Sequence, residues 1–351
     1  MIKIKSIIKN NIKNIFDRRI NRRIIFNKKA VFAIFNRRGF TYILSASFIL
    51  AVILLVFLTS NSYRNQDQQQ LYQLRIRSMN DFVKNFNSDV HRATYISAFR
   101  SLVALEDSVT TRGVFLNNTA DSFRETFFYG TLDGADVAIM ENSSFSEYID
   151  KVKILASNVG INLEVNVTKI VLSQSNPWFI DVDVIAYVNM SDSKRLSSWV
   201  YTQDFLTQIP ISDLRDPLYG KFTLNKVPNT IRRLNSSNLV NGTNTYYLQS
   251  LINGSYYIAS PYAPNFLERF EGNNSADING IESIVFIRSL SDQGIDVLEN
   301  SVKIDFIYFN NISTDKICNV QNVPANLFFV IPSNRVNYYN VSGLNYSVIC
   351  P

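Results

Sequence analysis

The chain has 351 residues, 46% of them apolar, with 35 Lys or Arg, 29 Asp or Glu and one His. Residues 1–39 hold twelve basic side chains and one acidic one, so they carry +11 and the remaining residues carry −5. This division excludes nucleic-acid binding as the reason for the high pI, because the larger part is mildly acidic. The content of 25 Phe and 18 Tyr excludes a fully disordered chain.

An uncharged segment runs from Phe40 to Tyr63, and almost all of its first nineteen residues are apolar. A helix rises about 1.5 Å per residue, so about 20 apolar residues cross a hydrocarbon core roughly 30 Å thick. The sequence therefore predicts a transmembrane helix at residues 40–63, with the lipid bilayer as its partner. The alternative, a core helix of a soluble protein, would need a polar face that this segment lacks.

The basic residues before the apolar segment predict its orientation. Lys and Arg near a membrane-spanning helix are retained in the cytosol, so we expect a single-pass protein of the cell membrane with a cytosolic N-terminus and an extracytoplasmic C-terminal ectodomain. Ile4, Ile8, Ile12 and Ile15 have helical spacing and favour an amphipathic helix on the membrane surface. An unstructured basic tail is an equal alternative. A mitochondrial targeting segment would also be basic, but it leaves the glycosylation motifs described below unexplained.

Two cysteines, Cys318 and Cys350, lie in the last tenth of the chain. An extracytoplasmic location is oxidising, so we expect one disulfide that closes a C-terminal loop and stabilises the fold by about 3 to 4 kcal/mol. The alternative is two separate thiols.

Asn-x-Ser/Thr sequons occur only after residue 111. Eleven are present, about twice the number expected by chance from the Asn, Ser and Thr content of that region. They predict a glycoprotein with an N-glycosylated outer surface, although an Asn-rich and Ser-rich chain also forms such motifs freely. The candidate glycosylation sites are Asn117, Asn142, Asn166, Asn189, Asn235, Asn241, Asn253, Asn273, Asn311, Asn340 and Asn345.

The junction between the basic residues and the apolar segment reads Arg-Arg-Gly-Phe-Thr-Tyr-Ile-Leu from Arg37 to Leu44. It resembles the processing site of type IV prepilins and pseudopilins. The resemblance implies that a prepilin-type peptidase cuts between Gly39 and Phe40, and that the apolar helix then packs with those of other pilin-like subunits. The match covers only the junction and the apolar helix.

Leu44 departs from the pattern of that family. The family usually has Glu at the fifth mature position, where it pairs with the N-terminus of a neighbouring subunit during assembly. Some minor pseudopilins lack this Glu. The resemblance therefore implies a minor subunit more than a major one.

Apolar residues recur at three- and four-residue spacing from Leu71 to Val103, and Gly113 follows. They predict a long amphipathic helix that continues the transmembrane helix. Helices are also expected at 121–129 and 145–158, the second because Ser144 and Glu147 have capping-box spacing and Gly160 suits a left-handed position at its end. Alternating strands are expected at 163–172, 179–188 and 200–209. The predicted fold class is α+β, with the long helix packed on an antiparallel sheet in a domain at 64–215.

Residues 216–351 have more Gly, Asn and Pro and predict a β-rich C-terminal region that contains the disulfide. It is either a second domain or part of the preceding one. We expect a hairpin around Asn253-Gly254, with strands at 246–251 and 256–258. A helix near 264–270, a segment at 281–287 and strands at 302–309 and 327–331 complete the chain.

No residue pattern specifies a catalytic, metal or cofactor site. The single His91 excludes a zinc site with two histidines from one chain, and it lies on the predicted long helix without a nearby acid pair. The pairs Glu106 with Asp107, Asp133 with Asp136, and Asp181 with Asp183 suit a glycosidase or calcium site in principle, but such acids are usually solvated. Trp178 and Trp199 suit a sugar platform or, more simply, the packing of a sheet.

The sequence thus favours a membrane-anchored extracytoplasmic surface protein without enzymatic activity, working as a pilin-like or pseudopilin-like structural subunit of the minor type. An unprocessed glycosylated adhesin or receptor is the alternative. A membrane-tethered hydrolase that uses carboxylates is a more remote one.

Overall fold

The computed structural model describes residues 37–227, 229–236, 239–241, 244–254, 256–299, 301–314, 316–320, 329–343 and 348–350. The amphipathic helix expected in the N-terminal tail lies outside these ranges. The chain divides into two compact units after Leu74. Each is described by itself.

Helix α2 (Arg37–Arg112) contains the apolar segment and the start of the second unit. Residues 40–112 include no Gly or Pro, so nothing in the sequence interrupts the helix. It ends where the sequence predicts, because Gly113 has a left-handed φ of 64° and its N–H donates to Val109 O at 2.9 Å. Within the described residues, Gly39–Thr59 is the one candidate membrane span, with 21 residues, mean hydropathy 2.6 and no buried share.

Two shorter helices follow α2 in the second unit. Helix α3 (Thr119–Tyr129) begins at Asn118, whose side chain accepts a hydrogen bond from Asp121 N at 2.9 Å. Helix α4 (Phe145–Asn158) has the bounds predicted from the sequence and begins with the predicted capping box. Between them lie β1 (Thr131–Leu132), β2 (Ala135–Asp136) and η1 (Ala138–Met140).

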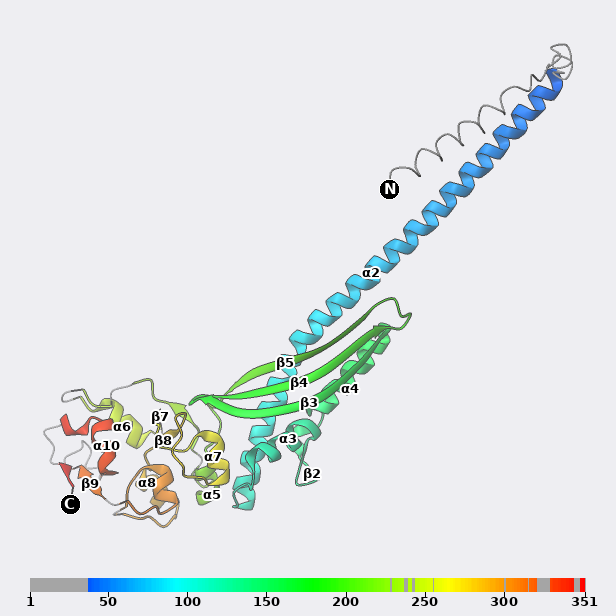
Figure 1. Cartoon of the computed structure of the whole chain (residues 1–351). Coiled ribbons are helices and arrows are strands. Elements are labelled where there is room, and N and C mark those ends of the chain that lie inside the picture. The colour runs from blue at the N-terminus through cyan, green and yellow to red at the C-terminus, as the bar shows by residue number, and fades with distance from the viewer. Residues whose placement is uncertain are drawn as a thin grey trace, which may run out of the picture. The chain divides into compact units, whose positions relative to one another are not determined.

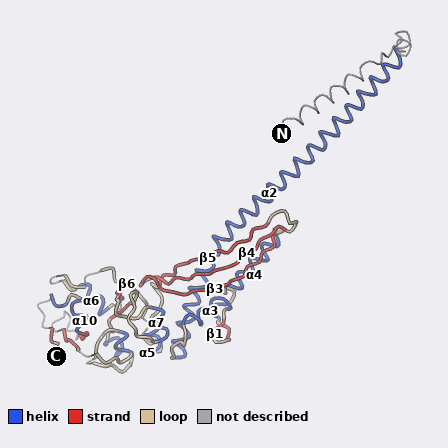
Figure 2. The backbone as a smooth tube through the Cα atoms, viewed as in Figure 1, coloured by secondary structure: helices blue, strands red, loops and turns tan. Residues whose placement is uncertain are grey.

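The three longest strands form an antiparallel sheet in the order β3 (Ile161–Asn176), β4 (Phe179–Asp192) and β5 (Ser198–Pro210). They lie side by side in Figure 1 and Figure 2. Every second residue of β4 from Ile180 to Met190 is buried, which defines the inner face of the sheet. From Asp183 to Asn189 the intervening residues, such as Tyr187, are exposed or half-buried and define the outer face. Local alternation was therefore enough to predict these strands.

One hydrophobic cluster joins the helices and the sheet of the second unit. It contains buried side chains of α2, α3, α4, β4 and β5, with contributions from residues after 210, including Phe86, Leu102, Phe127, Ile149, Val184, Phe205 and Phe270. A second cluster consists of residues after 217 and includes Leu248, Ile304, Phe329 and Tyr339.

The remaining elements are short. They are α5 (Pro217–Thr223), β6 (Arg232–Arg233), α6 (Tyr246–Asn253), β7 (Tyr256–Ala259), α7 (Phe266–Glu271), β8 (Ile281–Ser283), α8 (Ile287–Asp292), α9 (Asp305–Phe309), β9 (Ile317–Val320), β10 (Phe329–Pro332), α10 (Ser333–Tyr338), η2 (Val341–Gly343) and β11 (Val348–Ile349). They form two three-stranded sheets, in the orders β6-β7-β8 and β10-β9-β11.

Two strand predictions in this region are wrong. Residues 246–251, expected as the first strand of a hairpin, lie in helix α6, where Leu248, Leu251 and Ile252 share the buried face. Of the strand expected at 302–309, residues 305–309 form helix α9. The apolar positions of both segments fit a helix as well as a strand, since α9 is buried on nearly all sides. The described part of residues 216–351 is therefore mixed and not β-rich.

Candidate functional site

The junction at Gly39 lies in the first turns of α2. A Cβ placed on Gly39 would meet no atom within 4 Å, and the side chains of Phe40 and Leu44 are exposed. Three hydroxyls of the apolar segment are satisfied within the helix. Ser45, Ser47 and Thr59 donate to the carbonyl three residues earlier at 3.0, 2.9 and 3.0 Å. This arrangement suits an apolar solvent, in which a hydroxyl without a partner would be costly.

The second unit begins with an ion pair that joins α2 to the sheet. Arg75 pairs with the buried carboxylate of Asp192 at the end of β4, and its Nη2 donates to Gly160 O at 2.6 Å. Lys194 N donates to the other Asp192 oxygen at 2.8 Å. The hydrogen bond from Arg75 holds the pKa of Asp192 below its usual value, against the opposing effect of burial. The sequence analysis did not predict this pair, because the two residues are separated by 117 positions and no local sequence pattern connects them.

A buried arginine network lies in the C-terminal part of the second unit. Arg269, which is 0% exposed, donates from Nη1 to Asp216 at 2.7 Å and to Asp305 at 2.8 Å. Tyr257 Oη donates to Asp216 at 2.7 Å, and Ser283 Oγ donates to Asp305 at 3.0 Å. Burial lowers the pKa of Arg269, but the two carboxylates raise it by more, so the arginine stays charged.

A second buried ion pair lies beside this network. Glu282 accepts from Arg335 Nη2 at 3.1 Å and from Tyr339 Oη at 2.7 Å. The guanidinium of Arg335 also stacks on the ring of Tyr262, with 4.2 Å from Cζ to the ring centroid. Both groups of charges are enclosed by protein, so they serve the packing of the short elements.

The residues considered for chemistry do not come together. His91 is exposed, and its Nδ1 lies 3.4 Å from Thr207 Oγ1, so its described neighbours do not form a triad. Within the described residues, no group of His, Cys, Asp or Glu could hold a metal ion. Trp199 is half-buried and packs against the core.

The paired acids have separate surroundings. Glu106 is buried, and burial raises its pKa well above the usual value, although Arg215 opposes this shift. Asp107 is more exposed and pairs with Arg215. Asp133 pairs with Arg112 at the surface, and Asp136 is exposed.

Asp181 and Asp183 also differ from each other. Asp181 accepts hydrogen bonds from Ser175 N at 3.1 Å and from Gln208 Nε2 at 2.9 Å. The pKa of Asp183 is raised, mainly by burial and to a smaller extent by the negative charge of Asp204. Among the described residues, these acids therefore act as hydrogen-bond acceptors, ion-pair partners or isolated carboxylates.

Trp178 forms part of a surface pocket as well as the core. The pocket has a volume of about 610 Å³ and is also lined by Arg233, Asn235, Ile258 and Tyr338. The indole is buried against the first cluster, and the Arg233 guanidinium carbon lies 5.2 Å from its ring centroid. Sequence reasoning considered Trp178 but not its partners, which come from distant segments.

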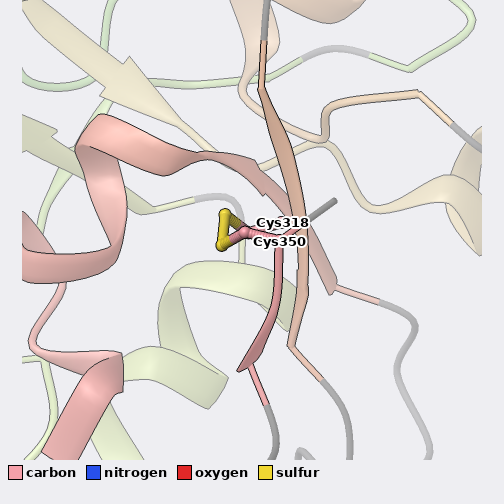
Figure 3. The surroundings of a disulfide bond; sticks show 2 residues. All are labelled: Cys318 and Cys350. Atoms are coloured by element: carbon pink, nitrogen blue, oxygen red, sulfur yellow. A yellow bond between two sulfur atoms is a disulfide. The ribbon is translucent and has the colours of Figure 1, made fainter.

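The two cysteines form the predicted disulfide, with Cα atoms 4.2 Å apart. Strand β11 pairs antiparallel with β9 through Val348 opposite Val320 and Ile349 opposite Asn319. The next position of this ladder brings Cys350 opposite Cys318, as Figure 3 shows. The bond thus holds the last strand to the sheet.

Ten of the eleven sequon asparagines lie among the described residues, and the exception is Asn345. Nine of the ten are exposed and Asn189 is half-buried. Asn166 and Asn189 both lie on the outer face of the long sheet, where Asn166 is opposite Tyr187 and Asn189 is opposite Glu164. The nine exposed asparagines are therefore open to a surface modification.

Comparison of the chain with protein-family models, with curated proteins and with solved structures finds no match.

Proposed function

We propose that the chain is a single-pass surface protein of the cell membrane that works as a pilin-like or pseudopilin-like structural subunit. The observation that carries this proposal is helix α2. It begins at the Arg-Arg-Gly junction, continues through the uncharged 21-residue span Gly39–Thr59 without a buried side chain, and extends into the core of the second unit.

The apolar segment needs an apolar environment outside its own chain. Leaving a Leu, Ile, Val or Phe side chain in water instead of burying it costs about 1.5 to 3 kcal/mol, and the segment contains more than ten of them. A bilayer supplies that environment, and so does a bundle of equivalent helices. A subunit that moves from one to the other needs no change in this surface.

The charge distribution supports a cytosolic N-terminus and an extracytoplasmic second unit. The disulfide and the exposed sequons suit the same location, because disulfides persist in oxidising compartments and N-glycans occupy exposed asparagines. We infer from these features a glycosylated ectodomain at the cell surface.

The amphipathic part of α2 belongs to the core of the second unit. Its buried residues share a cluster with the inner face of the long sheet, and Tyr201 Oη donates to Asn87 on α2 at 2.8 Å. We infer that this part of the helix covers the sheet, which is also the arrangement that the resemblance to pilins implies.

Leu44 supports the proposal that the chain is a minor subunit of a filament. An exposed apolar side chain stands where the resembling family usually has the assembly carboxylate. Such a subunit lacks the charge that pairs with a neighbour's N-terminus, so we propose that it joins a filament as a minor component.

The test is a bulky side chain at the proposed cleavage site. Gly39→Val should block cutting by a prepilin-type peptidase, and the surface protein should retain its basic leader of +11, visible as a larger intact mass. Ser45→Val is the matched control, because it adds a similar side chain within the helix away from the junction. A wild-type surface protein whose intact mass already includes residues 1–39 would contradict processing at this position.

A further inference from the structure

The pocket beside Trp178 has a mixed lining. Leu234 and Ile258 form a largely buried apolar floor, and Tyr338 presents an aromatic ring that is 39% exposed. Its volume of about 610 Å³ lies within the range of about 300 to 1,000 Å³ that is usual for small-molecule sites. The pocket can therefore accommodate a compact group such as one or two sugar rings.

The rim of the pocket includes a sequon asparagine. Asn235 is exposed, lines the pocket and begins the sequon Asn-Ser-Ser. Two further pockets, of about 620 and 410 Å³, are lined by described residues that include no sequon asparagine. Val167 and Thr168 of the Asn166 sequon line the pocket of 620 Å³, but only beside Trp178, among the three, does the sequon asparagine itself line the pocket.

The lining suits a carbohydrate. The C–H groups of a sugar face carry slight positive charge and pack on the negative face of an aromatic ring such as Tyr338. The guanidinium of Arg233 is held near Trp178, and no described carboxylate lies within salt-bridge distance of it. Its N–H groups can donate to sugar hydroxyls or to the carboxylate of an acidic sugar.

We propose that Asn235 carries an N-linked glycan whose first sugar residues pack into this pocket, against Tyr338 and beside Arg233. The inference rests on the extracytoplasmic location in the proposed function and adds a structural role for one glycan. Packed in this way, the glycan connects the turn before β4, the segment after β6 and helix α10. It contributes to the fold of the C-terminal part and is not simply a surface coat.

The experiment combines glycopeptide mass spectrometry with arginine labelling of the full-length protein from its native membranes. Phenylglyoxal modifies accessible guanidinium groups. Arg232 is the internal control, because it is exposed, adjacent in sequence and not part of the pocket lining. Asn235→Gln removes the sequon, and Asn253→Gln is the matched control at an exposed sequon outside the described pockets.

We expect sugar on Asn235 and slow labelling of Arg233 relative to Arg232 in the wild type. Asn235→Gln should raise the labelling of Arg233 severalfold, and Asn253→Gln should not. Tyr338→Leu should keep the sugar on Asn235 but also raise the labelling, because the aromatic wall is lost. A rise in the labelling of Arg233 in this variant distinguishes a glycan that packs on Tyr338 from one that only shields Arg233 sterically.

Several results would overturn the inference. They are an unmodified Asn235 beside other modified sequons, equal labelling of Arg233 in the wild type and Asn235→Gln, or no change in Tyr338→Leu. Sugar at none of the sequons would contradict the glycosylated surface of the proposed function as well. Processing at Gly39 is measured separately, so the two proposals can fail independently.

Discussion

The apolar segment Gly39–Thr59 and the interior of the second unit differ in the charge that they contain and in how they are buried. The segment contains no charge and buries none of its side chains, so its stability depends on a solvent or partner outside the chain. The second unit instead buries charged groups, with Arg269, Asp216 and Asp305 enclosed and mutually paired.

The difference shows how each region avoids an unfavourable environment for its side chains. A buried charge without a partner would cost several kcal/mol, and the second unit pairs Arg269 and Arg335 with buried carboxylates inside its own fold. The apolar segment instead exposes its side chains, so it depends on apolar surroundings outside the chain. The following substitutions test each half of this comparison.

The largest effect should come from charges in the apolar segment. Ile49→Arg with Ile53→Arg places two charges on one helix face near its centre, at about 2.5 to 3.5 kcal/mol each for membrane insertion. We expect the protein to leave the membrane fraction in a flotation assay. Ile49→Leu with Ile53→Leu, which keeps the surface apolar, should float as the wild type does. If the double arginine variant still floats, the segment is not the membrane anchor.

The next effect concerns the buried arginine network. Arg269→Met leaves two buried carboxylates without their cation and should destabilise the second unit by about 3 to 5 kcal/mol. Arg288→Met is the control, because that side chain is 82% exposed and its pair with Asp292 is worth less than about 1 kcal/mol. Denaturant unfolding of the full-length protein in detergent measures both. Similar midpoints for the two variants would contradict an energetic role for the network.

The disulfide should contribute about 3 to 4 kcal/mol through the loop that it closes. Cys318→Ala with Cys350→Ala should therefore unfold at lower denaturant concentration, and the reduced wild type should match this variant. Peptide mapping without reduction should join the two cysteines. Recovery of both as alkylated thiols without prior reduction would show that the bond does not form in the mature protein.

The smallest effect should come from the ion pair between α2 and the sheet. Arg75→Met removes a charge-assisted hydrogen bond worth about 1.5 to 3 kcal/mol. Because the folded pKa of Asp192 is lowered, its ionised form stabilises the fold above about pH 4, and this contribution is lost as the pH falls through the lowered pKa. The gap in melting temperature between the wild type and Arg75→Met should therefore narrow in acid.

Arg77→Met is the control for that measurement, since Arg77 is exposed and has no ion pair among the described residues. It should melt with the wild type at every pH. A gap for Arg75→Met that does not depend on pH would mean that Asp192 is not the group involved.

Local signals were sufficient for much of the fold. Helix α4 was predicted with its bounds because a capping box at Ser144 and a left-handed glycine at Gly160 enclose an amphipathic segment. The long strands alternate cleanly because one face of their sheet is buried and the other is more exposed. The disulfide followed from having only two cysteines.

Long-range pairing was not predictable. The network around Arg269 joins residues 53 and 36 positions away, and no local pattern marks such partners. Helix α9 was mistaken for a strand because burial on nearly all sides removes the periodicity that distinguishes the two. The pocket beside Trp178 needs Arg233 and Tyr338 in one place, which only the tertiary structure provides.

The N-terminal sequence of the mature surface protein tests the central claim most directly. The account predicts that it begins at Phe40, with the basic leader removed and the apolar helix available to pack among other subunits. Recovery of Met1 or Ile2 from the mature protein would contradict the filament subunit and favour an unprocessed, membrane-anchored surface protein.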